Sequence, residues 1–212
     1  MADVRAFRDA VTGWAAAGTG PGAGEPAARA RELAALLPVR TAVLLEGLSD
    51  VAAVETLAAR RGRDLAAEGV CVVPMGGAMS VGRFTVLLGP GGLGLRLTGL
   101  CDENEHPFYD RAFLRAGAPP RDVFVCARDL EDEFLRALGT DRVEEIVRAE
   151  GDLRPWQTFR RQPAQLERPV HEQLRRFLGT KKGRKIRYGR LLVEALGPGR
   201  APRPLEDLFA TL

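Results

Sequence analysis

Three short apolar runs pass directly into acidic residues, and these acids are the side chains best suited to chemistry. AVLLE ends on Glu46, with Asp50 four residues later; LRLTGLC runs into Asp102; and DVFVC is followed by Asp129, Glu131 and Asp132. Carboxylates brought close together repel each other and raise each other's pKa, and a divalent cation removes that conflict. Because Mg²⁺ and similar hard cations prefer oxygen ligands, we expect these acids to hold one or two Mg²⁺ or Mn²⁺ ions.

The elements around these acids predict how they are positioned. Four apolar runs bounded by Gly, Pro or acid are expected to be strands, at 42–46, 70–74, 95–101 and 122–126. Helical patterns lie between them, at 49–61, 80–88 and 106–116. Alternation of helices with continuously apolar strands predicts an α/β fold with a mainly parallel four-stranded sheet covered on both faces. Ligands gather at the carboxyl ends of such strands, so the acids should converge if the strands are neighbours.

Each acid also has an ordinary explanation. Asp50 could be only an acid at the N-terminus of a helix, where the helix dipole favours negative charge. Glu131 could be a solvated residue in the first turn of its helix, and Asp102 could cap the helix that begins near His106. The recurrence of acids at successive strand ends favours a shared site.

Helical segments are expected on both sides of the sheet region. An N-terminal pair is separated by GTGPGAGEP, which we interpret as a flexible break. After the fourth strand, helices are expected to end at Gly139 and Gly151, and the remainder is mainly helical with a short final helix. We therefore divide the chain into an N-terminal helical lead-in (1–38), an α/β domain (39–140) and a basic, mainly helical C-terminal extension (141–212).

Charge is distributed unevenly along the chain. Residues 151–212 carry 14 Lys and Arg against 6 Asp and Glu, a net charge of +8, whereas residues 1–150 carry a net charge of −5. Six of the eleven residues at 180–190 are basic. This segment could be a solvated basic loop, but basic side chains also neutralise phosphates, so it is the part of the chain best suited to contact a polyanion.

Hydropathy and cysteine usage predict an intracellular protein. No apolar run approaches the roughly 18 residues that a membrane helix needs, and MADVRAFRDAVTGW is not a signal peptide. We therefore expect a cytoplasmic protein without membrane contact. Cys71, Cys101 and Cys126 lie in or at the end of apolar runs and form no CxxC pair, so we expect buried, reduced thiols and no zinc site.

Four segments in order, LLEGLSD, PMGG, GLCD and DLEDEFLRALG, resemble the TOPRIM domain. This Rossmann-like, Mg²⁺-binding fold is shared by topoisomerases, primases and the OLD-family nucleases. The OLD branch is the most similar, with its EGxSD opening, its Gly pair after a strand and its LE-containing helix after the fourth strand. The resemblance covers about residues 40–140 and implies a TOPRIM fold with metal-dependent nuclease activity.

The resemblance also implies roles for individual residues. Glu46 would be the TOPRIM glutamate, a metal ligand or general acid/base, and Asp50 would be an OLD-type metal ligand. Asp102 would be the first acid of the DxD motif. The second acid of that motif falls on Asn104, a weaker and uncharged ligand, and Glu105 is a possible substitute one residue later.

Two further roles follow from the resemblance. Glu131 matches a later acid of OLD nucleases, and Asp132 is a candidate for the same role. OLD nucleases also use a downstream lysine near the transition-state phosphate, for which we favour Lys185 over Lys182 because it precedes the helical pattern 186–196. The residues expected to bind nucleic acid are Lys181, Lys182, Arg184, Lys185 and Arg187.

These implications favour a nuclease acting on nucleic acid, with DNA expected first, although the residues do not distinguish DNA from RNA. OLD nucleases are usually fused to an ATPase, but the nearest match to a Walker A motif, GAMSVGRF, has Arg83 and Phe84 in place of Lys and Ser/Thr. An ATPase would therefore be a separate chain. The alternative is a TOPRIM-like module that binds nucleic acid or a partner with weakened or lost catalysis, as Asn104 suggests.

Other TOPRIM branches are less consistent with the sequence. A primase or topoisomerase fragment is disfavoured because Tyr109 and Tyr188 lie in no catalytic-tyrosine context. The RNA maturase branch stays open, and the sequence does not determine the oligomeric state.

Overall fold

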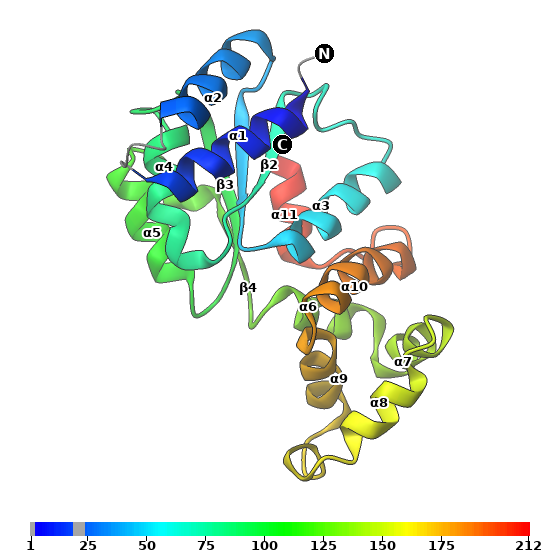
Figure 1. The fold of residues 1–212 in the computed structure, drawn as a ribbon. Coiled ribbons are helices and arrows are strands. Elements are labelled where there is room, and N and C mark those ends of the chain that lie inside the picture. Colours follow the sequence, from blue (N-terminus) through cyan, green and yellow to red (C-terminus); the bar gives the residue numbers. More distant parts are fainter. Residues whose placement is uncertain (1–2, 19–23) are drawn as a thin grey trace.

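The protein is an α/β structure built on one parallel sheet of four strands (Figure 1). The computed structural model describes residues 3–18 and 24–212, so the predicted break at 18–26 lies mostly outside the described part. The strand order is β2-β1-β3-β4, with all neighbouring pairs parallel. The strands are β1 (Thr41–Leu45), β2 (Val70–Pro74), β3 (Arg96–Asp102) and β4 (Val123–Cys126). The predicted fold class and all four strands are thereby confirmed.

Alternate residues of the central strand β1 enter two separate cores. Val43 and Leu45 pack on one face of the sheet, and Ala42 and Leu44 pack on the other. Successive side chains of a strand point to opposite faces, so a strand buried on both sides must be apolar throughout. This explains the uninterrupted apolar run that predicts the strand.

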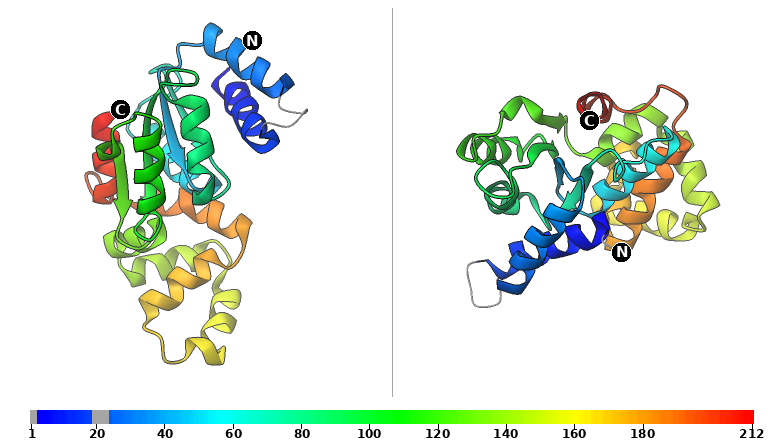
Figure 2. Two further views of the ribbon diagram at one scale, coloured as in Figure 1. Left: turned by 90° about the vertical axis from the view of Figure 1, so that its left-hand side faces the viewer. Right: turned by 90° about the horizontal axis from the view of Figure 1, so that it is seen from above.

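Helices cover both faces of the sheet (Figure 2). One layer contains α3 (Leu48–Arg60), α10 (Lys182–Ala195) and α11 (Arg203–Thr211). The other contains α1 (Val4–Ala17), α2 (Gly24–Leu36), α4 (Val81–Leu88) and α5 (His106–Arg115). The N-terminal and C-terminal helices thus lie on opposite sides of the sheet.

A helical unit extends beyond the carboxyl end of the sheet (Figure 1). It consists of α6 (Leu130–Leu138), α7 (Thr140–Ala149), α8 (Leu153–Arg160) and α9 (Val170–Gly179). Trp156 is buried against Phe177, with the ring centroids 5.2 Å apart. Short 3₁₀ turns complete the chain, η2 (Ala78–Ser80), η3 (Pro120–Asp122) and η4 (Pro163–Gln165). The division of the chain at residues 38 and 140 stays a prediction.

The cysteines agree with the sequence on a simpler point. Cys71, Cys101 and Cys126 are free and buried. Burial raises the pKa of both Cys71 and Cys101 to about 12, so these thiols stay protonated at neutral pH. No helix in the described part of the chain is both long and apolar enough to cross a membrane.

A glycine allows α10 to lie directly on α3. A Cβ added to Gly189 would be only 2.6 Å from the backbone oxygen of Ser49, so no larger residue fits without moving a helix. At the other end of the seam, the Arg60 guanidinium donates to the Leu196 carbonyl at 2.8 Å and also to the Val193 carbonyl. The close approach brings Lys185, one helical turn before Gly189, to the N-terminal end of α3.

Substituting this glycine tests the helix contact. We expect Gly189→Ala to lower the free energy of unfolding by about 1–3 kcal/mol, because the methyl group meets backbone that cannot move independently. Gly183→Ala is the matched control, since a Cβ at Gly183 meets nothing within 4 Å in the same helix. It should be neutral or stabilise by up to about 1 kcal/mol through the unfolded state. Urea denaturation of the two variants measures the difference, and equal stability would contradict the packing described.

Asp152 joins the helical unit to α10. It lies just before α8 and accepts hydrogen bonds from Arg184 and Tyr188 at 3.3 and 3.1 Å, and it also pairs with Arg187. The Arg184 side chain is only 7% exposed, and Asp152 supplies the negative partner for this buried guanidinium. Burial alone would raise the pKa of Asp152, but the hydrogen bonds from Arg184 and Tyr188 outweigh burial and lower the pKa below 3.8.

This lowered pKa predicts a pH-dependent contribution to stability. A carboxyl whose pKa is lower in the folded state stabilises above its unfolded pKa, here near 3.8, and loses that effect as the pH falls through the folded value. We expect Asp152→Asn to cost about 1.5–3 kcal/mol at pH 7, with the deficit relative to wild type shrinking below about pH 4. Urea denaturation as a function of pH measures this dependence.

Asp207→Asn is the control for Asp152→Asn. Asp207 also pairs with an arginine, Arg203, but both side chains are well exposed, at 50% and 90%. An exposed pair contributes little, so its removal should change stability by less than about 1 kcal/mol at any pH. A deficit for Asp152→Asn that does not change with pH would exclude the charged network as its cause.

Candidate metal centre

Glu46 lies at the carboxyl end of β1 and is fixed by its neighbours. The loop after β2 continues the pairing with β1, since the Met75 N–H donates to Leu45 O at 2.9 Å and the Gly77 N–H donates to Glu46 O at 3.0 Å. Gly77 has φ +126°, a conformation that a residue with a Cβ rarely adopts. The PMGG sequence therefore has a structural role, because it holds the backbone of Glu46 in place.

Three carboxylates converge at this edge of the sheet. Asp102 ends β3, the strand that lies between β1 and β4, and Glu105 lies directly before α5. Glu46, Asp102 and Glu105 each place one carboxylate oxygen within 4.8 Å of the other two. Asn104 is exposed, whereas Glu105 is partly buried. The residue that joins Glu46 and Asp102 is thus the substitute we named, Glu105, rather than Asn104.

The electrostatics of this cluster reflect burial first and repulsion between the carboxylates second. Burial, followed by the negative charges of Asp129, Glu105 and Glu46, raises the pKa of Asp102 to about 8. Burial and the charge of Glu46 also raise the pKa of Glu105. Without a bound cation Asp102 therefore holds a proton that an isolated carboxylic acid would have released at neutral pH.

The arrangement fits a divalent cation. Oε2 of Glu105 is buried and has no hydrogen-bond partner within the described structure, which is costly for a carboxylate oxygen. A set of three carboxylates suits hard cations such as Mg²⁺ and Mn²⁺. A cation would satisfy this oxygen and relieve the repulsion among the three side chains.

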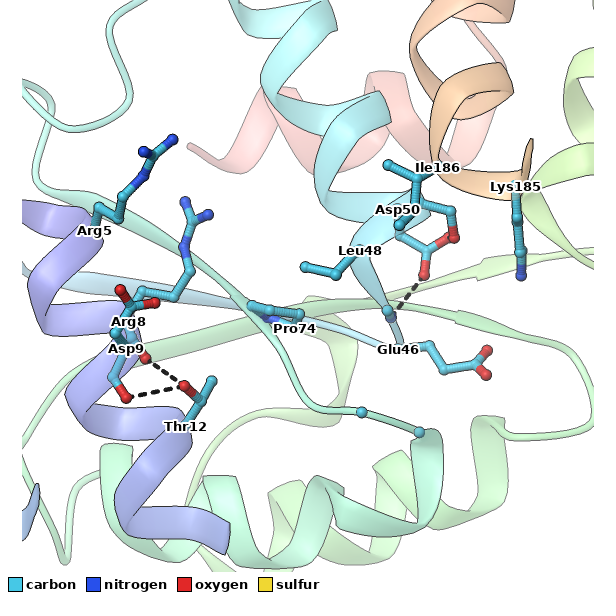
Figure 3. Close-up of a pocket in the computed structure, with 14 residues that line it drawn as sticks. Arg5, Arg8, Asp9, Thr12, Glu46, Leu48, Asp50, Pro74, Lys185 and Ile186 are labelled. Atoms are coloured by element: carbon cyan, nitrogen blue, oxygen red, sulfur yellow. Dashed lines mark hydrogen bonds between the residues drawn. The ribbon is translucent and has the colours of Figure 1, made fainter. Parts of the chain in front are cut away.

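Asp50 and Lys185 lie beside Glu46, one member of the three-carboxylate cluster (Figure 3). Asp50 accepts a hydrogen bond from the Gly47 N–H at 2.9 Å, so it does cap the start of α3, as the simpler explanation holds. Burial, and to a smaller extent the negative charge of Glu46, raises the pKa of Asp50. The positive charge of Lys185 opposes this shift without cancelling it. A capping role and a place beside the metal centre are therefore compatible.

Glu131 is paired with Lys185. The Lys185 ammonium lies 3.5 Å from Oε1 of Glu131, and the Glu131 side chain is 12% exposed, so it is not the solvated residue considered as the alternative. Burial raises the pKa of Glu131 to about 7, with Lys185 opposing the shift. Burial would lower the pKa of Lys185, but Glu131, Asp50 and the neighbouring acids raise it overall. Lys185 is therefore held in its charged form by the surrounding carboxylates.

Other residues that we predicted for the site lie elsewhere. Asp132 is buried beside His171, whose Nε2 is 2.8 Å from its Oδ1, and it also pairs with Arg136 at 3.2 Å. Arg184 and Arg187 are engaged with Asp152, as described above. These three side chains make ion pairs with other side chains of the protein, and their roles as a metal ligand and as nucleic-acid contacts stay predictions.

The two remaining predicted contacts lie at the start of α10. Lys181 is exposed and lines a shallow cleft between α8 and α10. The side chain of Lys182 lies outside the described structure. Their predicted contact with nucleic acid stays a prediction.

Asp129 follows the fourth strand among the acids noted in the sequence, but it had no individual role assigned. It caps α6 through the Asp132 N–H at 2.8 Å and pairs with Arg175 at 2.5 Å, while its charge raises the pKa of Asp102. The feature of the site that was missed at the level of sequence is α1, whose Arg5 and Arg8 line the cleft that contains Glu46 (Figure 3).

Two clefts meet at Lys185. The larger, of about 630 Å³, runs from α1 to Glu46, Asp50 and Lys185. The smaller, of about 370 Å³, continues from Lys185 and Glu131 to Asp129 and to arginines of α9. The acidic edge therefore lies between two open clefts, each with basic side chains in its wall.

Comparisons with known proteins agree with this geometry. Residues 39–103 match the family model described as the TOPRIM domain of proteins like the overcoming lysogenization defect (OLD) protein. The matched segment contains Glu46, Asp50 and Asp102. No curated protein matches the chain significantly.

Solved structures extend the likeness beyond the matched segment. The C-terminal region of the OLD protein of Xanthomonas campestris pv. campestris is 20% identical, with a TM-score of 0.60, and the match covers 81% of this chain and 93% of that one. The C-terminal region of the Burkholderia pseudomallei OLD protein is 17% identical, with a TM-score of 0.57 over 82% and 98% of the two chains. At these identities the structures establish the fold. This chain thus contains an OLD-like TOPRIM domain and has the fold of the C-terminal regions of OLD proteins.

Proposed function

We propose that this protein is a nuclease that hydrolyses phosphodiester bonds of nucleic acid with the help of Mg²⁺ or Mn²⁺. The observation that carries the proposal is the convergence of Glu46, Asp102 and Glu105, with their oxygens within 4.8 Å of one another, beside Lys185, which is paired with Glu131. The OLD-like TOPRIM match over residues 39–103 supports the same activity. DNA is the substrate we test first.

The three converging carboxylates would hold the cation, and Asp50 and Glu131 are the flanking groups available to a second one. A bound Mg²⁺ supplies Lewis acidity toward a phosphate oxygen and lowers the pKa of a bound water. The contribution of this chain is to fix the ligands. Glu46 is held by the Gly77 N–H, and Asp102 is held by strand pairing on β3.

Lys185 is placed to act on the phosphate. Its ammonium remains protonated because acids surround it, and a fixed positive charge stabilises negative charge that develops on a phosphate oxygen during hydrolysis. Glu131 holds it at 3.5 Å, a distance that leaves the other ammonium hydrogens free to donate to a substrate. The helix contact at Gly189 sets its position.

The cleft on the α9 side suits a polyanion. Arg176 is exposed at its wall, and Arg175 is held there by Asp129. Phe159 lines the same cleft and offers an aromatic surface to a base. Arginines and an aromatic ring beside the metal centre are consistent with a nucleic-acid strand rather than with a small neutral substrate.

Removal of the central carboxylate should abolish hydrolysis. We expect Glu46→Gln to lower the rate of plasmid nicking in Mg²⁺ or Mn²⁺ by at least about 100-fold, because a metal-polarised step contributes several kcal/mol. Glu103→Gln is the matched control, since Glu103 is an exposed acid on the same loop as Glu105. Equal nicking by wild type and Glu46→Gln would exclude the nuclease and leave the alternative, a module that binds nucleic acid or a partner without catalysis.

Cation binding should require Glu105 and not Asn104. Binding to the folded state alone stabilises by an amount that rises with the cation concentration over its Kd, so millimolar Mg²⁺ should raise the Tm of the wild type. We expect Glu105→Gln to reduce this increase and Asn104→Ala to preserve it, because Glu105 places an oxygen within 4.8 Å of the other two carboxylates whereas Asn104 is exposed. Calorimetry with and without EDTA measures both shifts. If only Asn104→Ala lost the Mg²⁺-dependent rise in Tm, Asn104 rather than Glu105 would be the ligand.

A further inference from the structure

The cleft between α1 and the acidic edge is not explained by the metal centre alone. One end is formed by Glu46, Asp50 and Lys185, and the other by α1, which contributes Arg5 and Arg8 (Figure 3). Helix α1 lies outside the segment matched to the family model, which begins at residue 39. The cleft therefore joins Glu46 and Asp50, which lie within the matched segment, to a helix that lies outside it.

The two arginines at the α1 end are held differently. Arg8 is anchored, since it pairs with Glu55 of α3 and its side chain is only 18% exposed. Arg5 is exposed and has no ion pair within the described residues, although the exposed acid Asp9 also lines the cleft. Arg8 thus fixes α1 against α3, and Arg5 is left as a cation available to a ligand.

The floor of the cleft is apolar between its charged ends. Leu48, at the start of α3, is 46% exposed, and Pro74 and Ile186 lie beside it. Gly76, with no side chain, leaves the floor open. A ligand that fits must carry negative charge and also present an apolar surface, and an unpaired nucleotide has both in its phosphate and its base.

The α1 cleft is continuous with the acidic edge, and this continuity indicates which ligand it binds. Lys185 lines both this cleft and the one on the α9 side, so a strand with its phosphate at the acidic edge has an open path in each direction. We propose that the α1 cleft binds the single-stranded segment next to the scissile phosphate, with Arg5 on a backbone phosphate and Leu48 against a base or sugar. The proposal rests on the proposed nuclease function and adds α1 as part of the substrate-binding surface.

Binding measurements test this directly. A fluorescent single-stranded DNA oligonucleotide is titrated in Ca²⁺ at several salt concentrations, and a gel confirms that it stays intact. We expect Arg5→Ala to weaken binding about 3- to 10-fold and to reduce the slope of log K against log salt by about 0.7, the value for one phosphate contact on a single strand. Arg5→Lys should recover the slope. Leu48→Ala should weaken binding and leave the slope unchanged.

Arg121→Ala is the matched control. Arg121 is an exposed arginine at the amino end of β4, on the edge of the sheet away from the metal centre. The Arg121→Ala variant loses the same charge as Arg5→Ala. If both weakened binding equally, the loss would be explained by net charge alone, and the proposal would be overturned. Wild-type affinity and slope in Arg5→Ala, with nicking intact in the wild type, would also overturn it and leave the nuclease standing. A wild type that neither binds nor nicks nucleic acid would contradict both.

Discussion

The repulsion among carboxylates at the carboxyl edge of the sheet is the constraint around which the structure is arranged. Parallel strands necessarily bring their ends to one edge, and here the ends of β1 and β3 carry Glu46 and Asp102. Such a cluster is unfavourable by itself, as the raised pKa of Asp102, about 8, indicates. Two kinds of positive charge can balance it, a bound cation at the centre and the ammonium of Lys185 at the side.

The need to place the Lys185 ammonium beside the carboxylates explains the arrangement of the helices beyond the sheet. After β4 the chain forms the helical unit α6–α9. It then returns to the sheet region as α10, which packs along α3. The return is accurate because Gly189 lets the two helices touch and Asp152 ties α10 to the helical unit. Many of the basic residues in the C-terminal segment serve this docking. Arg184 and Arg187, which look in sequence like a surface for a polyanion, are examples.

The sequence predicted the parts of the site that depend on strand ends. Buried strands followed by acids identify Glu46 and Asp102, because the end of a parallel strand fixes both position and direction. The choice between Asn104 and Glu105 was left open, since it depends on where α5 begins. The partners of Arg184 and Arg187 lie about 30 residues away and leave no local pattern. Arg5 was missed because a single arginine on an amphipathic helix is common and does not by itself indicate a binding site.

The seam between α3 and α10 has a consequence for the order of events during folding. The groups at the acidic edge come from positions 46, 102, 131 and 185, so no fragment that stops short of α10 contains all of them. Contacts over such separations form late, after the intervening loops have closed. A chain that is still being synthesised therefore lacks the Lys185 ammonium until α10 has been made, so any step that depends on this charge becomes possible only after the seam with α3 has formed.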